Sequence, residues 1–415
     1  MSPTSRTALA ALVIAGTALF LPAAFVYAAF VALAVAAIAD ALIARRALDM
    51  NRSVPRVVAR GVSVPLIISL DGDAPDRAWV RQANAPDLDV QPATATAGLD
   101  ARLVATRRGL LTLPPVAARR VGPLGLGAAT FTGAEPAEVL SYPDVVAAQR
   151  IVIALRRGRF REPGRRTRGP LGLGTEFESI RDYLPDDDMR QINWRATARM
   201  GRPMTNQYRL EQDRDITCLL DAGRLMGAPL GLMTRVDAAV DAITAVALVA
   251  DEVGDRCGVV VFDSEIRRRV TPRRGGGRTV VQAILDIEPT TVDSDYDLAF
   301  RSVGSSKRGL VIVCTDLVDD AAARSLLRAV PVLARRHAVV VASVLDPDLE
   351  AAVRRDPTTP RDVYASAVAH DVLDARVGVR TALQRSGATV IEAKPGQLGD
   401  ACVATYLRLK ARARL

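Results

Sequence analysis

The chain has 415 residues, too many for one ordinary domain, and this length predicts two or three folded units. Hydrophobic residues make up 49% of the chain, aromatic residues only 4%, and the net charge is +9. So few aromatic side chains argue against a stacking surface for single-stranded nucleic acid, and no zinc-finger or RNA-recognition pattern is present. We therefore expect no nucleic-acid partner; a membrane surface or a protein suits the positive charge better.

Histidine and cysteine usage narrows the chemistry further. His337 and His370 are the only histidines, which removes zinc proteases and most Ser/His hydrolases from consideration. The chain also lacks the GxxxxGK[ST] loop of P-loop ATPases. The cysteines are widely spaced and form no CxxC pair, so we expect reduced core residues. They are Cys218, Cys257, Cys314 and Cys402.

The N-terminus predicts a membrane anchor, residues 1–50. Residues 7–39 carry no charge, and as one straight helix they would span roughly 50 Å against a hydrocarbon core of about 30 Å. Pro22 divides the run, which favours a helical hairpin of residues 8–21 and 23–44. Arginines flank both ends, which predicts the cell inner (plasma) membrane with the soluble domains cytoplasmic. A single tilted span and a cleaved signal peptide are the alternatives.

Residues 51–140 predict a small β-sandwich-like domain, because short β-type runs such as 62–70 and 103–106 alternate with turn-rich stretches. Residues 141–210 then form a basic linker and a signature segment. Between Arg150 and Arg168 arginines far outnumber acids, and glycine and proline predict a loop. This loop is either a solvated linker or a contact with anionic lipid.

Residues 211–415 alternate between β and α patterns. Apolar strands are expected at 216–220, 257–262, 310–315, 338–345 and 388–392, and helices at 235–253, 279–286, 320–335, 361–384 and 397–411. This alternation predicts a doubly wound, mostly parallel α/β sheet. Ligands bind such sheets at the carboxyl ends of strands, where Asp221 and Asp316 fall.

Residues 174–199, GTEFESIRDYLPDDDMRQINWRATAR, are unlike an ordinary helix or strand. They closely resemble the signature of the bacterial family called domain of unknown function 58. The resemblance extends from the apolar N-terminus to residues 406–412 and so covers nearly the whole chain. Many relatives have a glycine where this chain has Asp186. The resemblance implies a von Willebrand A-like C-terminal half, a membrane-anchored N-terminus and association with MoxR-type AAA+ ATPases.

The signature mixes arginines, carboxylates and apolar anchors, and two interpretations stay open. Its paired charges either brace the segment against the sheet or form a partner-docking surface. If the stretch is extended, Trp194 and Ile192 share a face, so we expect Trp194 to be largely buried. The candidate partner-binding residues are Glu176, Arg181, Tyr183, Asp187, Asp188, Arg190, Asn193, Trp194 and Arg199.

A degenerate metal site is the second candidate. The resemblance to metal-binding von Willebrand A domains implies an Asp-x-Ser-x-Ser loop after the first strand, a threonine and a later aspartate. Here Asp221 matches, but Gly223 and Leu225 replace both serines. Asp316 matches the later aspartate, and Ser294 or Asp295 lies where the threonine is expected. Mg²⁺ prefers oxygen ligands, so losing two hydroxyls predicts no cofactor, with a weakly held Mg²⁺ as the alternative.

These observations predict a non-catalytic, membrane-anchored adaptor or scaffold that binds protein partners, with a MoxR-type AAA+ ATPase as the implied partner. Its role would lie in the assembly or maturation of a complex. The rival is a metal-dependent hydrolase that uses Asp221, Asp316 and the Asp186, Asp187 and Asp188 cluster. Convergence of these carboxylates in one concave pocket would favour the enzyme.

Overall fold

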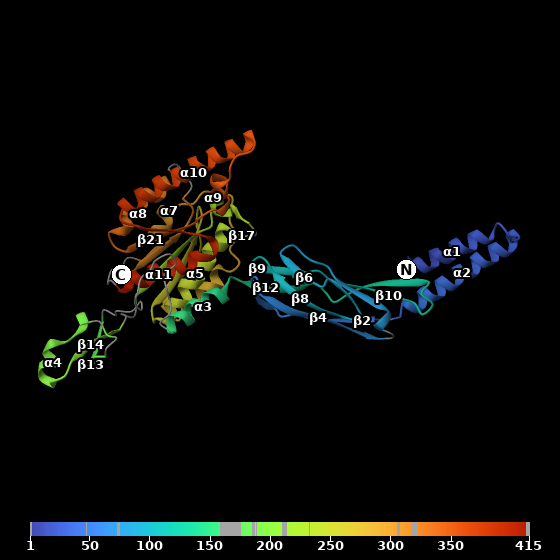
Figure 1. Cartoon of the computed structure of the whole chain (residues 1–415), viewed down its shortest axis with the longest axis horizontal. Helices are drawn as coiled ribbons and strands as arrows, with labels where there is room; N and C mark the ends of the chain where they lie inside the picture. Colours follow the sequence, from blue (N-terminus) through green and yellow to red (C-terminus); the bar gives the residue numbers. More distant parts are fainter. Residues whose placement is uncertain are drawn as a thin grey trace. The chain divides into compact units, whose positions relative to one another are not determined.

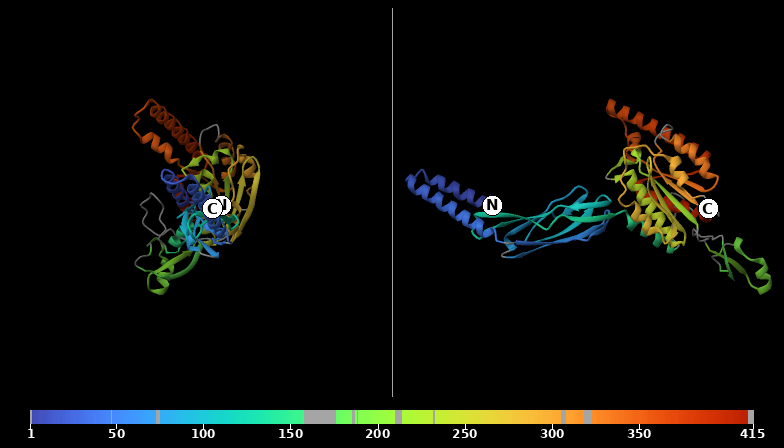
Figure 2. Two further views of the ribbon diagram at one scale, coloured as in Figure 1. Left: turned by 90° about the vertical axis from the view of Figure 1, so that its right-hand side faces the viewer. Right: turned by 180° about the vertical axis from the view of Figure 1, so that it is seen from behind.

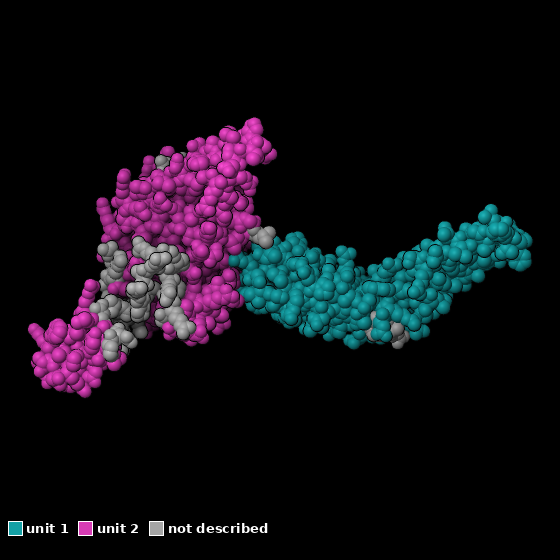
Figure 3. All heavy atoms as spheres, viewed as in Figure 1, with its two compact units in different colours: residues 1–142 teal, residues 143–415 magenta. Residues whose placement is uncertain are grey.

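The protein divides into two compact units, Met1–Tyr142 and Pro143–Leu415, coloured separately in Figure 3. The computed structural model describes residues 2–46, 48–72, 75–157, 176–184, 187, 189–209, 214–231, 233–304, 308–317 and 323–411. It is a mixed α/β protein with several sheets, as the sequence predicts.

The first unit begins with two apolar helices, α1 (Ser5–Thr17) and α2 (Ala23–Ala44), which lie side by side (Figures 1 and 2). Among the described residues, α2 is the one helix long and apolar enough to cross a membrane. Helix α1 is shorter, about 20 Å at the usual helical rise, and ends at Thr17 rather than at residue 21 as predicted. Pro22 is the N-cap of α2, where the fixed backbone angle of proline suits the start of a helix.

The rest of the first unit is built from β-sheets. A five-stranded sheet has the order β1-β11-β10-β5-β7, a four-stranded sheet the order β2-β4-β8-β6, and a three-stranded sheet the order β3-β12-β9. Alternate residues of these strands meet in one core, for example Leu66 and Leu103 from the second sheet and Val80 and Val116 from the first. The strands are β1 (Ser2–Pro3), β2 (Leu48–Ser53), β3 (Val57–Ala59), β4 (Ser63–Gly72), β5 (Ala78–Gln82), β6 (Leu88–Gln91), β7 (Thr94–Thr96), β8 (Leu99–Ala105), β9 (Gly109–Leu113), β10 (Val116–Val121), β11 (Gly127–Gly133) and β12 (Ala137–Tyr142), with a 3-10 helix η1 (Pro75–Arg77).

A buried carboxylate joins the helices to the β-sheets. Asp40 of α2 is fully buried and accepts the backbone N–H groups of Leu124, Leu126 and Gly127 at 2.7–2.9 Å. These amides belong to the turn between β10 and β11. A Cβ on Gly127 would lie 2.4 Å from the backbone N of Ala41, so glycine permits this close approach. Glycine in this turn therefore lets its backbone pack directly against helix α2.

The carboxyl end of α2 is held by a buried arginine. Arg120 of β10 donates from Nε to the carbonyl of Ala44 at 2.9 Å and also bonds the carbonyl of Arg46. Its guanidinium lies 5.4 Å from the ring centroid of Phe131. A cation at this end satisfies carbonyls that the helix leaves without partners and opposes the negative pole of its dipole.

We predict that Asp40→Ala loosens the 122–127 turn. Three amides would lose their acceptor, and that of Gly127 is buried, where an unsatisfied polar group costs about 1–3 kcal/mol. Hydrogen exchange of the full chain in detergent should show faster exchange across this turn. Asp49→Ala, an exposed aspartate of β2, is the control and should leave exchange unchanged. Unchanged protection in Asp40→Ala would contradict the clamp.

The second unit contains a six-stranded sheet with the order β19-β18-β15-β20-β21-β22. Strands β18, β15, β20, β21 and β22 pair in parallel, and only the edge strand β19 is antiparallel. The strands are β15 (Asp215–Asp221), β18 (Arg256–Phe262), β19 (Ile266–Arg274), β20 (Leu310–Cys314), β21 (Ala338–Val344) and β22 (Thr389–Ala393).

Helices cover both faces of this sheet, because alternate strand residues point into two separate cores. Cys218 and Leu220 pack with α3, α5, α6 and α11, whereas Leu219 packs with α7, α8 and α10 (Figure 1). The helices are α3 (Val145–Arg156), α5 (Arg235–Glu252), α6 (Gly277–Ile284), α7 (Tyr296–Ser302), α8 (Arg324–Ala334), α9 (Pro347–Arg354), α10 (Pro360–Arg385) and α11 (Leu398–Ala411). The 3-10 helices η3 (Arg224–Gly227) and η4 (Pro395–Gln397) and the short strands β16 (Pro229–Leu230) and β17 (Met233–Thr234) lie in its connections.

Several predicted elements need correction. Residues 150–156 belong to helix α3 rather than to a loop, because Ala148 and Ile151 pack against the helical core and Asp144 caps the helix. Arg157 is the C-cap of this helix, and residues 158–168 lie outside the described residues. The sequence analysis also missed β19, α7 and α9.

The signature forms a small antiparallel arm, residues 176–209. It consists of β13 (Glu176–Asp182), the 3-10 helix η2 (Met189–Gln191), α4 (Trp194–Met200) and β14 (Met204–Arg209), with β13 paired to β14. The expectation of an extended chain at Trp194 is wrong, because Asn193 caps a helix that begins there. Gly201 ends this helix in the left-handed conformation, at φ 66°.

Candidate functional site

Two buried carboxylates lie at the carboxyl ends of neighbouring parallel strands. Asp221 is the last residue of β15, and Asp316 follows the end of β20. Their exposed fractions are only 2% and 5%. A buried carboxylate is costly unless donors or cations compensate it, so the surroundings of each decide what chemistry is available.

Asp221 is compensated entirely by hydrogen-bond donors of this chain. One carboxylate oxygen accepts the N–H of Gly223 at 2.8 Å and the hydroxyl of Ser294. The other accepts the hydroxyls of Tyr296 at 2.9 Å and Thr315 at 2.6 Å. Four donors match the approximate number of lone-pair sites on an ionised carboxylate. Asp221 therefore has no lone pair left over for a further ligand.

Gly223 makes this closure possible. A Cβ built at Gly223 would lie 2.1 Å from Oγ of Ser294, so a serine at this position would collide with it. The neighbouring Arg224 turns away from Asp221 and pairs with exposed Asp293. Asp295 is the N-cap of α7, with its carboxylate accepting the N–H of Leu298 at 3.0 Å.

Tyr296 remains a donor over the physiological pH range. Burial, followed by the negative charge of Asp221, raises the pKa of Tyr296 well above its ordinary value. The phenol packs edge-on against Phe262, at 5.5 Å between ring centroids, and its oxygen lies 2.8 Å from the hydroxyl of Thr315. The phenol of Tyr296 therefore keeps its proton, and its hydrogen bonds tie the first turn of α7 to the ends of β15 and β20.

Asp316 is compensated by two buried arginines. Arg235, the first residue of α5, forms an ion pair with it, and Arg376 of α10 donates to it at 3.1 Å. Arg235 also pairs with Asp346 at 3.3 Å, and Arg376 donates to the carbonyl of Val344 at 2.9 Å. The two guanidinium groups therefore supply, at the end of β20, the positive charge that a bound metal ion would otherwise bring to Asp316.

The described residues contain no group of three or more histidine, cysteine, aspartate or glutamate side chains placed to hold a metal ion. Of the predicted metal residues, Asp221 and Ser294 come together, whereas Asp295 serves as a helix cap and Asp316 belongs to the adjoining ionic network. The sequence analysis missed the partners that close the site: Arg235, Tyr296, Thr315, Ser343 and Arg376. The chain order carries no signal that these distant residues meet.

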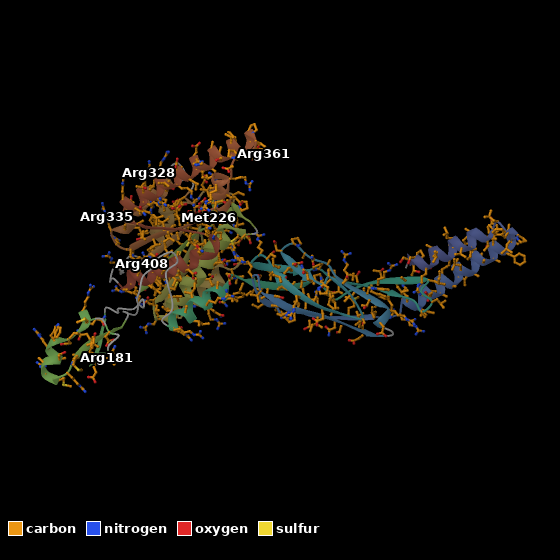
Figure 4. The ribbon with its side chains drawn as sticks, viewed as in Figure 1. Arg181, Met226, Arg328, Arg335, Arg361 and Arg408 are labelled. Carbon is orange, nitrogen blue, oxygen red and sulfur yellow. The ribbon has the colours of Figure 1, made fainter. Side chains whose placement is uncertain are left out.

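Part of the signature holds the arm together. Arg181, labelled in Figure 4, forms a two-pronged ion pair with Asp187 at 2.6 and 2.8 Å. Hydrogen bonds from Arg181 and from the amide of Leu184 hold the pKa of Asp187 below its ordinary value. Tyr183 donates to the carbonyl of Asp187 at 3.1 Å, and Asn193 donates to Asn206 at 2.8 Å. These residues brace the arm internally.

Other signature residues face solvent. The side chain of Trp194 is 70% exposed, which contradicts the expectation of a buried tryptophan. Its position as the first residue of α4 lifts it away from the strand pair, where Met204 and Thr205 are buried instead. Met189, Leu184 and Met200 are also exposed apolar residues of the arm. Arg190 and Arg199 are exposed; the side chain of Glu176 and all of Asp186 and Asp188 lie outside the description.

Comparisons with known proteins agree with the signature. The family described as "Protein of unknown function DUF58" matches residues 179–357, from the arm to the end of α9, so the predicted resemblance is confirmed over a narrower stretch than expected. The uncharacterized protein Rv1480 of Mycobacterium tuberculosis is 24% identical over 268 residues, which is 59% of this chain and 82% of that protein. The uncharacterized protein Mb1516 of Mycobacterium bovis gives the same values.

We predict that Asp316→Ala lowers the free energy of unfolding of the second unit by about 3–5 kcal/mol, because it leaves two buried guanidinium groups without their shared carboxylate. Chemical denaturation followed by circular dichroism measures the effect. Asp293→Ala removes the partner of an exposed arginine instead and should cost less than about 1 kcal/mol. Equal stability of the two variants would show that the buried network contributes little.

Proposed function

We propose that this protein, a member of the domain of unknown function 58 family, is a membrane-anchored adaptor that docks a protein partner and catalyses no reaction itself. The observation that carries the proposal is the exposed Trp194 on the braced arm. A large aromatic side chain held in water by a structured scaffold is the kind of residue that anchors protein interfaces.

The chemistry around Trp194 indicates the character of the partner. Helical spacing puts Trp194, Arg195, Ala198 and Arg199 on one side of α4, and all four are exposed. An indole flanked by two guanidinium groups suits an apolar pocket with an acidic rim. A MoxR-type AAA+ ATPase, the partner implied by the family resemblance, is our candidate, with a role in assembling or maturing a complex.

We assign the second unit to the von Willebrand A type. Support comes from the parallel order β18-β15-β20-β21-β22, helices on both faces and two aspartates at the strand ends. In the metal-binding members of this type an open ligand position accepts the partner's carboxylate, but here Asp221 and Asp316 are already engaged by internal donors and cations. We propose that partner recognition therefore works without a metal and takes place on the arm.

The same contacts argue against the hydrolase. Catalytic carboxylates must reach a substrate or activate water, whereas Asp221 and Asp316 are buried and Asp187 is paired with Arg181.

The apolar helices α1 and α2 support membrane anchoring. Many of their large side chains are exposed, among them Leu9, Leu12, Phe25, Tyr27 and Val31, each by 60% or more. So large an exposed apolar surface is rare on a protein surrounded by water. We propose that the two helices insert as a hairpin into the inner (plasma) membrane. The β-sheets of the first unit and the whole second unit then lie in the cytoplasm.

We predict that Trp194→Ala abolishes capture of the partner while leaving thermal unfolding unchanged. Truncation of an interface anchor costs about 2 kcal/mol or more of binding, whereas substitution of an exposed residue usually changes stability by about 0.5 kcal/mol or less. Affinity purification of the full chain from native membranes, with quantification of co-purifying proteins, measures the loss.

Tyr364→Ala is the matched control, since Tyr364 of α10 is an aromatic residue that is 74% exposed. It should retain the partner. If Trp194→Ala retains every specific co-purifying protein, the arm is not the docking surface. If its melting temperature falls together with binding, the tryptophan acts on the fold.

We also predict that Mg²⁺ does not stabilise the protein. A ligand present at 100 times its dissociation constant would add about 2.7 kcal/mol, so a thermal melt with and without millimolar Mg²⁺ is a sensitive test. No shift is expected, because the oxygens of Asp221 are committed to four donors. A rise in melting temperature that Asp221→Ala removes would disprove the metal-free proposal.

A further inference from the structure

A basic cavity lies where the apolar helices meet the β-sheets of the first unit. Its volume is about 800 Å³. The start of α1, the 3-10 helix η1, strands β5 and β10 and the 122–127 turn contribute its walls. Since the Asp40 clamp fixes this turn to α2, the cavity has a defined position at the base of the helix pair.

Three arginines from separate segments line the cavity: Arg6 of α1, Arg77 of η1 and Arg119 of β10. Their guanidinium groups form no ion pair or hydrogen bond with another described residue, although Arg77 also interacts electrostatically with the buried carboxylate of Asp40. One acid, Asp76, also lines the cavity, so the side chains give it a net positive charge. Guanidinium groups gathered from three elements favour an anionic ligand, and phosphate matches their donor geometry.

The backbone adds to this positive charge. Thr4 is the N-cap of α1, but its hydroxyl donates to the carbonyl of Gly125 instead of accepting from the helix. The first turn of α1 contains no acidic residue. The positive end of its dipole therefore adds to the charge of Arg6.

The level of the cavity identifies the source of the anion. Arg6 is the last charged residue before the uncharged stretch of residues 7–39, so the cavity begins where the apolar helices end. Trp79 of β5 lines the cavity, is half exposed and lies directly opposite Arg119 across the strand pair. Tryptophan and arginine together are typical of the headgroup level of a bilayer.

We propose that this cavity binds the phosphodiester headgroup of an anionic phospholipid. The inference rests on the proposed membrane anchor and adds a specific lipid site to it. Arg77 and Arg119 bind the phosphate, Arg6 and the first turn of α1 complete the positive field, and Trp79 lies against the lipid at the membrane surface. Lipid bound there fills the cavity between α1 and the sheet.

Fluorescence quenching by brominated lipids tests the site in the full chain. Trp79 and Trp194 are the only tryptophans, so Trp194→Phe leaves Trp79 as the single reporter. In vesicles of phosphatidylcholine, brominated phosphatidylglycerol should quench Trp79 more than brominated phosphatidylcholine does at equal mole fraction. Arg77→Gln with Arg119→Gln should remove the preference, since each basic residue near the surface contributes about fivefold.

Two further variants separate the site from general charge and from misfolding. Arg81→Gln with Arg102→Gln removes the same charge from exposed positions on β5 and β8 outside the cavity and should keep the preference. Arg77→Lys with Arg119→Lys should keep most of it. Loss of the preference in the control pair would show that the net charge of the unit, not the cavity, selects the lipid.

The remaining outcomes are also decisive. Equal quenching by the two lipids in the parent protein would overturn the lipid site while leaving the membrane anchor intact. Absence of quenching by either lipid would refute the lipid site, and the anchor would fall with it only if the protein also failed to sediment with the vesicles. Saturable binding of inorganic phosphate in vesicles of phosphatidylcholine alone, lost in Arg77→Gln with Arg119→Gln, would assign the cavity to a soluble phosphate and overturn the lipid assignment.

Discussion

A buried carboxylate has to be neutralised or surrounded by donors, and this constraint organises the second unit. Asp221 draws Ser294, Tyr296 and Thr315 onto the end of β15, while Asp316 draws in Arg235 and Arg376. Through these contacts the first turns of α5 and α7 and the middle of α10 are fixed to the carboxyl edge of the sheet. Elsewhere in the unit, Asp255 accepts from Tyr406 and Lys410 and fixes α11 in the same way.

The same constraint acts in the first unit, where Asp40 takes three amides and so attaches the apolar helices to the β-sheets. In the arm of the second unit a partly buried carboxylate, Asp187, takes Arg181 and the amide of Leu184. Hydrogen bonds to a charged group are stronger than those between neutral groups, which makes a single aspartate sufficient.

The spacing of hydrophobic residues predicted the strands and helices that form the cores, because a buried face repeats apolar residues at the period of the element. The strands containing Cys218, Val259 and Ile312 and the long helix α5 are examples. Strand β19 escaped prediction because its exposed arginines hide the alternation of an edge strand. The short helices α7 and α9 are marked only by their caps, Asp295 and Asp346. Ser294 was predicted to lie near Asp221. The partners Arg235, Tyr296 and Arg376 could not be predicted, since they are far away in sequence and meet Asp221 or Asp316 only through the fold.

Trp194 shows where residue type misleads. Tryptophan side chains are highly buried on average. An extended strand would have placed Trp194 beside Ile192 on one face. The cap formed by Asn193 instead starts a helix, and a short helix beside a two-stranded sheet has too little apolar surface to cover an indole. The local backbone signal, an asparagine whose side chain accepts the amide of Ala196, was present in the sequence and outweighs the hydrophobicity of the next residue. The carboxylates of the sheet are committed to internal partners, whereas this aromatic side chain and the neighbouring arginines of α4 remain exposed.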